Sequence, residues 1–333
     1  MKVAQLVDIG KIEIEDKLFL DGLWAKDTLQ IKMKQVGICG SDLHYFRHGG
    51  LGTFVQEFPM PIGHEAVGIV NNPYDSSWFK KGDRVAIEPG RPCGTCSFCY
   101  EKRYNLCPNA SFLGANMNGA LQEYMMVHES QLKELHKTSF DYGVMLEPLS
   151  IALEAISLSK IKKKNKSVAI FGAGPIGLLI ALYLKKTEEV DVTIYDRLIY
   201  RIEFAESLGI KAKNINYIKD KKTADICFEC AGAQETINAC YKIVKIGGEI
   251  VLVGIPEHDY MFYNPHIARM KAITIYNCRR SNIPLSQVLT KAINSNMPLK
   301  KLITHHFKFE EVQKAFKTAS DYQDGIIKGV IKL

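Results

Sequence analysis

Four cysteines lie close together in the segment RPCGTCSFCYEKRYNLCP, with the spacing C-x2-C-x2-C-x7-C. Four thiolates in a compact, turn-rich loop match a closed tetrahedral zinc site, which stabilises a loop too polar to fold by itself. An iron–sulfur cluster is the alternative for the same ligands. Because every position is a thiolate, no coordination position is left for a substrate, and the predicted metal is structural. Its ligands are Cys93, Cys96, Cys99 and Cys107.

A glycine-rich turn follows an apolar run in SVAIFGAGPIGLLIALYL. Gly172 allows a tight turn, Gly174 lets the backbone approach a pyrophosphate, and Gly177 lets a helix pack closely on a strand. The N-terminus of that helix offers free amides and a positive dipole to phosphates. The motif therefore predicts a dinucleotide site, with a glycine turn of an unrelated α/β fold as the alternative.

The expected cofactor is NAD. Asp196 ends the next predicted strand, where a carboxylate accepts hydrogen bonds from the adenosine ribose and repels a 2′-phosphate. Arg197 beside it would favour the phosphate instead. The predicted cofactor-binding residues are Gly172, Gly174, Pro175, Ile176, Gly177, Asp196 and Arg201.

A second set of potential metal ligands is dispersed along the chain. Cys39 lies in GICGSDLHYF, and His64 and Glu65 are adjacent in PIGHEAVG. Alone, each would most often serve packing or lie on the surface. Together, in a chain that also carries a dinucleotide motif, they predict an open zinc site with soft and hard ligands.

The helices and strands that must position these residues lie in two regions with different sequence patterns. Residues 1 to about 148 hold short apolar runs separated by turn residues, which predicts a strand-rich domain. From there on, predicted strands and helices alternate, which is typical of a parallel sheet covered by helices. An amphipathic helix with apolar residues at helical spacing is expected near the C-terminus. The predicted strands are 28–36, 66–70, 84–88, 167–171, 191–195, 226–229, 249–253 and 273–276, and the predicted helices are 151–158, 177–186, 201–208, 234–243 and 309–319.

Length and composition limit the function classes. A chain of 333 residues predicts about two domains. No apolar stretch approaches the roughly 20 residues that span a bilayer, and charges interrupt the N-terminal stretch where a secretory signal would be apolar, so we expect a cytoplasmic protein without membrane association. The net charge of +7 comes largely from short lysine clusters, which indicate solvated surface rather than nucleic-acid binding. One such cluster is Lys162, Lys163, Lys164 and Lys166.

In order and spacing, these motifs resemble the zinc-containing medium-chain dehydrogenases, and within them the polyol branch of sorbitol (L-iditol), xylitol and L-idonate 5-dehydrogenases. The similarity also includes GDRVAIEPG and LEPLSIALEA, and it runs nearly end to end. It implies a GroES-like catalytic domain over residues 1–148 with the zinc lobe at about 90–108, a Rossmann NAD-binding domain over 149–274, and a return segment over 275–333 that completes the catalytic domain. It also implies a homodimer or homotetramer.

The resemblance also implies roles for individual residues. Cys39, His64 and Glu65 would hold a catalytic zinc, and Glu147 in LEPL would approach the metal or ligate it directly, so that two zinc ions are expected per chain. Ser41 and His44 match proton-relay positions, and Tyr45 and Phe112 match positions in the substrate pocket. One segment departs from the family: where sorbitol dehydrogenases carry an FRYxNT-like sequence, this chain has YNCRRSNIP, so that Arg279 or Arg280 would replace the family arginine.

The resulting hypothesis is an NAD- and zinc-dependent dehydrogenase that interconverts a secondary alcohol of a polyol or sugar-like substrate and its ketone. The alternative within the enzymes is a dehydrogenase of a phosphorylated, acidic or amino sugar, with an arginine of the YNCRRSNIP segment holding the anionic group. A zinc-ribbon protein that binds nucleic acid and a structural protein derived from a dehydrogenase are the alternatives from other classes. A nucleic-acid-binding zinc ribbon would give Cys39 and His64 no role. A structural protein derived from a dehydrogenase would be expected to have lost one of the metal ligands.

Overall fold

The computed structural model describes residues 1–18, 26–159, 161, 166–188, 190–218 and 223–333. The chain forms two compact units. Unit 1 consists of Met1–Glu147, Pro284–Gln287 and Pro298–Leu333, and unit 2 of Pro148–Ile283 and Val288–Met297. Three of the four lysines in the first predicted lysine cluster lie outside the described residues.

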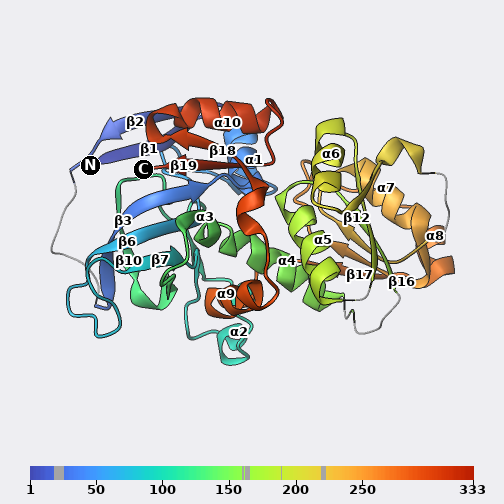
Figure 1. Ribbon diagram of the computed structural model, residues 1–333, viewed down its shortest axis with the longest axis horizontal. Coiled ribbons are helices and arrows are strands. Elements are labelled where there is room, and N and C mark those ends of the chain that lie inside the picture. The colour runs from blue at the N-terminus through green and yellow to red at the C-terminus, as the bar shows by residue number, and fades with distance from the viewer. Residues whose placement is uncertain (19–25, 160, 162–165, 189, 219–222) are drawn as a thin grey trace. The chain divides into compact units, whose positions relative to one another are not determined.

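Unit 1 is built around a seven-stranded sheet (Figure 1). The strand order is β11-β7-β6-β3-β19-β18, and β10 also pairs with β3. The last strand of the chain, β19, pairs antiparallel with β3, so that the C-terminal segment lies within the sheet formed by the N-terminal part of the chain. The strands are β3 (Thr28–Gly37), β6 (Glu65–Asn72), β7 (Arg84–Ile87), β10 (Tyr124–His128), β11 (Leu132–Glu134), β18 (Ile303–Lys308) and β19 (Lys328–Lys332).

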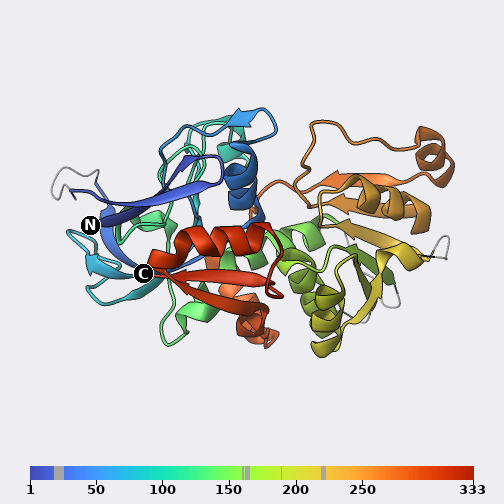
Figure 2. The ribbon, with the colours of Figure 1, turned by 90° about the horizontal axis from the view of Figure 1, so that it is seen from above.

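Two smaller elements cover this sheet. A hairpin of β1 (Lys2–Asp8) and β2 (Lys11–Asp16) precedes β3, and α10 (Val312–Ser320) lies beside β18 and β19 (Figure 2). The predicted amphipathic helix is confirmed, because Val312, Phe316 and their apolar neighbours on one face of α10 are buried. These side chains join the core that the apolar residues of β3 form. Unit 1 also contains the short helix α3 (Phe140–Gly143).

Unit 2 is a six-stranded sheet in which every pairing is parallel. The strand order is β14-β13-β12-β15-β16-β17, with helices packed beside the strands (Figure 1). The order reverses at β12, whose neighbours are β13 and β15, and in such sheets ligands bind at the carboxyl ends of the strands at this point. The strands are β12 (Ser167–Phe171), β13 (Asp191–Asp196), β14 (Lys211–Asn214), β15 (Ala224–Glu229), β16 (Val244–Leu252) and β17 (Thr274–Asn277).

The helices of this region are α4 (Leu146–Leu158), which begins at the end of unit 1, α5 (Pro175–Thr187), α6 (Ile199–Ser207), α7 (Gln234–Ile243), α8 (Pro265–Lys271) and α9 (Leu285–Asn294). The predicted doubly wound parallel sheet is confirmed, and β12 and α7 have the predicted bounds. The predicted end of the nucleotide domain at residue 274 falls at the start of β17. Because β17 pairs with β16, the second unit continues to Ile283.

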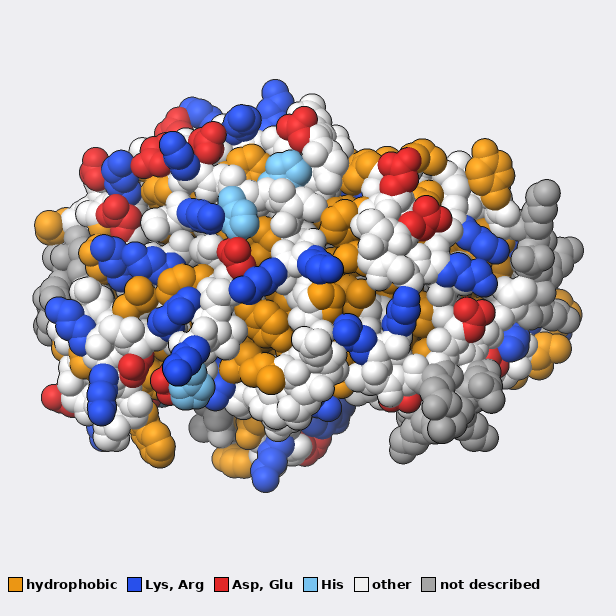
Figure 3. Space-filling model, viewed as in Figure 1, with side chains coloured by type: hydrophobic (Ala, Val, Ile, Leu, Met, Phe, Trp, Pro, Cys, Tyr) orange, Lys and Arg blue, Asp and Glu red, His pale blue; other side chains and the backbone are white. Residues whose placement is uncertain are grey.

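Charged side chains of both signs lie on the molecular surface. On the face that Figure 3 shows, Lys and Arg side chains lie among Asp and Glu side chains. Among the described residues, no helix combines the length and the apolar character that crossing a membrane requires.

Candidate active site and metal centres

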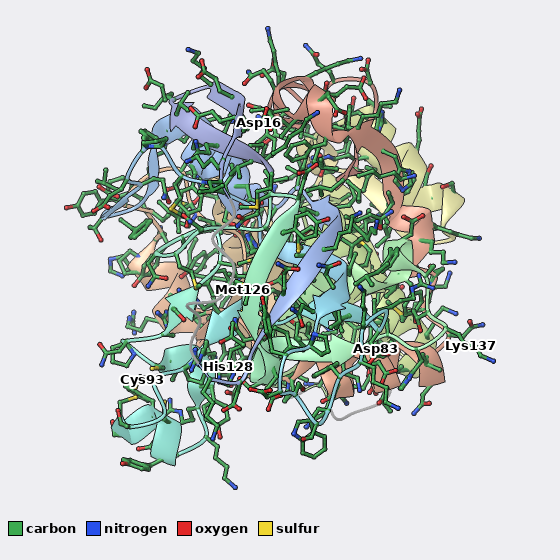
Figure 4. All side chains as sticks on the ribbon, turned by 90° about the vertical axis from the view of Figure 1, so that its left-hand side faces the viewer. Asp16, Asp83, Cys93, Met126, His128 and Lys137 are labelled. Carbon is green, nitrogen blue, oxygen red and sulfur yellow. The ribbon has the colours of Figure 1, made fainter. Side chains whose placement is uncertain are left out.

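The four predicted structural ligands meet in a small lobe of unit 1. Cys96 precedes the one-turn helix α2 (Ser97–Tyr100), which carries Cys99, and Cys107 follows the short 3-10 helix Tyr104–Leu106. Cys93 precedes both, and Figure 4 shows it in this lobe, apart from Met126 and His128 of β10. Two short helical turns thus position the cysteines, which all lie within one short segment of the chain.

The distances between the sulfur atoms fit a zinc ion. The Sγ atoms of Cys93 and Cys99 lie 3.9 Å apart, and that of Cys96 lies 3.5 Å from Cys99 and 3.8 Å from Cys107. A tetrahedral ion with metal–sulfur bonds of about 2.3 Å places its sulfurs about 3.8 Å apart. Among the described residues, this quartet is the only group of three or more His, Cys, Asp or Glu donors whose ligand atoms all lie within 4.8 Å of one another.

The thiols of the four cysteines do not all have the same pKa. Donors on Thr95 lower the pKa of Cys93 to about 6, whereas burial raises the pKa of Cys99 to about 11. Thiolates at this spacing repel one another, and a cation between them removes that repulsion. The donor set and its geometry therefore fit a closed structural zinc site.

The dispersed ligands are arranged around the fully buried Asp42. Cys39 caps the N-terminus of α1 (Gly40–His48), and Oδ2 of Asp42 accepts a hydrogen bond from the backbone N–H of Cys39 at 3.0 Å. Oδ1 lies 3.3 Å from Nδ1 of His64 and accepts from the N–H of Gly63 at 3.3 Å. One carboxylate thereby joins the start of α1 to the loop before β6. With Nδ1 turned to Asp42, Nε2 of His64 is the nitrogen left for a metal.

The charge around His64 favours its protonated form in the absence of a metal. Burial alone would lower the pKa of His64, but the negative charges of Asp42 and Cys39 raise it well above its usual value. A bound zinc ion would take the place of that proton, since metal ligands must be deprotonated. Asp42 was absent from the sequence prediction. The sequence does contain a signal for it. A carboxylate three residues after a helix cap can accept a hydrogen bond from the backbone N–H of the cap, and Asp42 has this position relative to Cys39.

The two candidate glutamates have different surroundings. Glu65 begins β6, is 1% exposed, and pairs with Nζ of Lys328 on β19. Glu147 lies in the first turn of α4, and burial raises its pKa to about 7, with His64 opposing the shift and Glu65 adding to it. Glu147 is therefore close enough to His64 and Glu65 for their charges to affect its pKa.

The remaining predicted site residues of unit 1 lie on α1 and β9 (Ser111–Phe112). Phe112 lies against the imidazole of His64, with 5.5 Å between the ring centroids. Ser41 and His44 are half-buried on α1, and Tyr45 is buried against Phe54. Phe112 is thus placed beside a predicted zinc ligand, and the catalytic roles of Ser41 and His44 stay predictions.

The glycine loop of unit 2 has the geometry that the motif predicts. Gly172 has φ +103° and its N–H donates to the carbonyl of Tyr195. A Cβ at Gly177 would lie 2.0 Å from the carbonyl oxygen of Gly172, so that helix and strand can approach only with glycine there. At Gly174, the cap of α5, a Cβ would meet only Arg201 within 4 Å, which leaves room above the loop for a ligand.

Asp196 fastens this loop to β13. Its Oδ2 accepts from the N–H of Ala173 at 2.7 Å and its Oδ1 from the N–H of Leu198 at 2.9 Å. Arg201 lies 3.8 Å from Oδ2 of Asp196, while Arg197 is exposed. Each carboxylate oxygen keeps a lone pair for a further donor, and the loop, the helix N-terminus and the carboxylate therefore fit a dinucleotide.

The two candidate substrate arginines follow β17 in unit 2. Arg279 is exposed, and Arg280 is half-buried with φ +51°, in the left-handed region. The predicted zinc ligands lie in unit 1. The assignment of either arginine to the substrate therefore stays a prediction.

Comparison with known proteins identifies the family. The alcohol dehydrogenase GroES-like domain matches residues 25–137, and the glucose dehydrogenase C-terminus matches residues 140–333. The chain is similar to D-xylulose reductase of Saccharomyces cerevisiae, at 35% identity over 91% of this chain and 89% of that protein. It is also similar to sorbitol dehydrogenase 1 of the same yeast, at 32% identity over 98% of this chain and 96% of that protein.

A solved structure agrees with these matches over the whole chain. L-idonate 5-dehydrogenase from Escherichia coli superimposes with a TM-score of 0.90 at 25% identity, covering 100% of this chain and 98% of that one. The chain therefore belongs to the zinc-containing medium-chain alcohol dehydrogenases, and within them to the group of polyol dehydrogenases. The predictions of a GroES-like domain and of an oxidoreductase of the zinc-type alcohol dehydrogenase class are confirmed. Zinc and a nicotinamide dinucleotide are the cofactors typical of this group.

Proposed function

We propose that the chain uses zinc and NAD to interconvert a secondary alcohol of a polyol or sugar-like substrate and its ketone. The observation that carries the proposal is the buried Asp42, which positions Cys39 and His64 together beside a buried glutamate, as a histidine-containing metal site requires. Zinc at this site would polarise the reacting oxygen, and NAD would accept or donate the hydride.

The chain's own residues would orient the substrate and carry the proton. Ser41 and His44 lie on the helix that Cys39 caps, where a hydroxyl and an imidazole can pass a proton from the substrate oxygen towards solvent. Phe112 would form an apolar wall beside His64. Tyr45 of α1 is proposed as a second residue of the substrate pocket.

The choice of NAD over NADP is assigned to Asp196. Its carboxylate lies at the end of β13, beside the glycine loop, where a 2′-phosphate would be repelled. The test is the ratio of kcat/KM for the two cofactors. A preference for NADP of tenfold or more, about 1.4 kcal/mol, would mean that Arg197 dominates and that this assignment is wrong.

The proposed substrate class follows from the relatives named for D-xylulose and sorbitol. A vicinal hydroxyl lets a polyol contact the metal and nearby polar groups together, which orients the carbon that loses hydride. We therefore expect polyols or aldonic acids to be oxidised faster than ethanol. A screen of sorbitol, xylitol, idonate, a hexitol phosphate and ethanol for NADH formation tests this, and a clear preference for a simple primary alcohol would contradict it.

An acidic or phosphorylated sugar is the second candidate substrate. The similarity to a structure of L-idonate 5-dehydrogenase and the pair Arg279 and Arg280 favour it. A guanidinium binds a carboxylate or phosphate through two parallel hydrogen bonds. If either arginine serves the substrate, Arg279→Ala or Arg280→Ala lowers kcat/KM for idonate or the hexitol phosphate more than for sorbitol. An unchanged ranking in both variants removes the arginines from substrate binding.

The protein is proposed to act in the cytoplasm as a homodimer or homotetramer. Unit 2 exposes large apolar side chains between β16 and β17, including Tyr260, Phe262 and Met270, which a second subunit would cover. Light scattering after size-exclusion chromatography measures the mass directly. A mass equal to one chain would contradict the oligomer.

A further inference from the structure

A buried carboxylate lies beneath the loops that follow two neighbouring strands of unit 2. Glu229 ends β15 and is 1% exposed. Its Oε1 accepts from the backbone N–H groups of Ala231 and Gly232, both at 2.9 Å, and from Oγ1 of Thr236 at 2.7 Å. Burial raises the pKa of Glu229, and these donors oppose the shift because they stabilise the ionised form. One side chain thereby fixes the β15 loop, residues 230–233, to the strand before it and the helix after it.

The same residue also holds the β16 loop, residues 253–256. The backbone carbonyl of Glu229 accepts from the N–H groups of Val253 at 2.8 Å and Gly254 at 2.9 Å. A Cβ at Gly254 would lie 2.2 Å from the backbone nitrogen of Gly232 and 2.7 Å from Oε2 of Glu229. A Cβ at Gly232 would lie 2.0 Å from a carbonyl oxygen of the β16 loop. Glycine at both positions therefore lets the two loops pack directly on each other and on the carboxylate.

The β15 loop lies against the glycine turn of the predicted dinucleotide site. The N–H of Cys230 donates to the carbonyl of Phe171, the last residue of β12, at 2.8 Å. A Cβ at Gly172 would lie 3.1 Å from the carbonyl carbon of Cys230 and 3.2 Å from the backbone nitrogen of Ala231. The turn and the loop are thus in direct backbone contact at the carboxyl ends of β12 and β15. In open parallel sheets, dinucleotides bind across this place, where the strand order reverses.

The two sides of β12 divide the dinucleotide into its halves. Asp196, at the end of β13, is the carboxylate predicted to accept from the adenosine ribose. The strand β15 is the neighbour of β12 on the opposite side from β13. The β15 loop is therefore on the side that is left for the nicotinamide half.

We infer that Glu229 is a positioning residue that holds the β15 and β16 loops together as one preformed wall for the nicotinamide half of the cofactor. The inference deepens the proposed function and rests on its use of a nicotinamide dinucleotide. Glu229 acts from beneath the loops and does not itself touch the cofactor. A site whose loops are already ordered loses less freedom on binding, so that the carboxylate sets the affinity for the cofactor.

Equilibrium binding to the full-length protein tests the inference. NADH is titrated by its fluorescence, and ADP, which carries only the adenosine half, is titrated by calorimetry. Glu229→Gln replaces one carboxylate oxygen by an NH2 group that cannot accept, and it should raise the Kd for NADH at least about tenfold, as expected when a hydrogen bond to a charged group is lost. The Kd for ADP should not change, because ADP would bind on the β13 side of β12. An equal rise in both Kd values would mean a general loss of structure and would overturn the inference.

The opposite end of the same strand offers a matched control. Asp225 of β15 accepts from the N–H and Oγ of Ser167, both at 2.8 Å, and from Nζ of Lys245 at 3.0 Å. Asp225→Asn thus weakens a comparable set of hydrogen bonds, at the amino ends of the strands. It should lower the Tm as Glu229→Gln does and leave the Kd for NADH unchanged. The same rise in Kd for both variants would show that Glu229 acts only through overall stability.

A milder variant keeps the test decisive if Glu229→Gln does not fold. Thr236→Val removes one donor to Oε1 and retains the shape of the side chain, so the Kd for NADH should rise by a smaller factor, again without a change for ADP. An unchanged Kd for NADH in a folded Glu229→Gln, or in Thr236→Val where Glu229→Gln does not fold, overturns the inference. If the unmodified protein binds NADPH alone, the choice of NAD is wrong and the same titrations are made with NADPH. Binding of neither dinucleotide would contradict the proposed function itself.

Discussion

We expect the cysteine lobe and the dispersed site to hold their metals by opposite means. In the lobe, the ligands are at most 14 residues apart and their sulfur atoms already lie at the spacing of a zinc tetrahedron. In the dispersed site, Asp42 bonds to a loop 21 residues away, and Glu65 pairs with a lysine 263 residues away. We therefore expect the lobe to depend on its metal for its fold, and the dispersed site to depend on the fold of unit 1 for its geometry.

The largest expected effect is on turnover, from the dispersed site. Cys39→Ala or His64→Ala should lower kcat by at least about 1000-fold, because the metal supplies several kcal/mol of charge stabilisation, while the midpoint of urea unfolding changes little. Steady-state NADH formation and urea titration measure the two effects. His258→Ala, which removes an exposed histidine of unit 2, is the control and should leave both unchanged. A large loss of stability in Cys39→Ala would break the comparison.

The second effect is on stability, from the lobe. Cys96→Ala or Cys107→Ala should lower the free energy of unfolding by at least about 3 kcal/mol, because a structural zinc contributes to folding directly. Cys240→Ala removes a buried thiol of α7 and should cost roughly 1 kcal/mol. Differential scanning calorimetry with zinc analysis gives both numbers. If Cys96→Ala and Cys240→Ala cost the same, the lobe does not owe its stability to a metal.

The same contrast explains what could be predicted from the sequence. The lobe and the glycine loop are local, so that their spacing alone indicates their chemistry. The strand β16 begins at Val244, earlier than the predicted residue 249, because Val244 pairs with Ala224 before an irregularity after which Glu249 pairs with Ile226. Gly247 lies in this irregularity with φ +70°, so the local preference of glycine for a turn is realised within the strand.

For the dispersed site, the sequence predicted the metal ligands but not the residues that contact and orient them. Cys39 and His64 follow from their motifs, whereas Lys328 has no local signal, since a lysine near the C-terminus is expected on the surface. Its burial depends on Gly37 and Glu65, which the pairing of β3 with both β19 and β6 brings next to it. The role of a residue that arises from long-range strand pairing cannot be predicted from the spacing of motifs along the sequence.

The third effect is a pH dependence of stability that belongs to the surroundings of the dispersed site. Burial raises the pKa of Glu88 to about 7, against a hydrogen bond from the N–H of Leu285. Between pH 4.5 and 7 the folded state then holds a proton that the unfolded state has lost, so the free energy of unfolding falls as the pH rises. The contribution amounts to at most about 3 kcal/mol.

Glu88→Gln should remove this dependence, because its amide oxygen still accepts from Leu285 and no longer ionises. Urea unfolding at pH 5 and pH 8 should therefore show the variant to be more stable than the unmodified protein at pH 8 but not at pH 5. Glu203→Gln, an exposed position on α6, is the matched control and should leave the pH dependence as it is. Equal slopes for Glu88→Gln and the unmodified protein would show that Glu88 ionises freely.

The smallest effect is expected at Asp42, where the two regions can be compared within one variant. Asp42→Asn keeps a side-chain oxygen for Cys39 or Gly63 but removes the negative charge that faces His64. Loss of such a supporting carboxylate typically weakens metal binding 10- to 100-fold. We expect one of the two zinc ions to be removed by a chelator at a 10- to 100-fold lower concentration, while the zinc of the lobe is unaffected.

A cap control separates this electrostatic effect from the loss of a helix cap. Ser139 caps α3 and accepts from the N–H of Tyr142, so that Ser139→Ala loses a cap without touching either metal region. It should lower stability by about 1 kcal/mol with both zinc ions retained. If Asp42→Asn also loses only stability, Asp42 acts as a cap alone. If it loses the zinc of the dispersed site first, the site depends on a buried charge that the lobe, with its four thiolates, does not need.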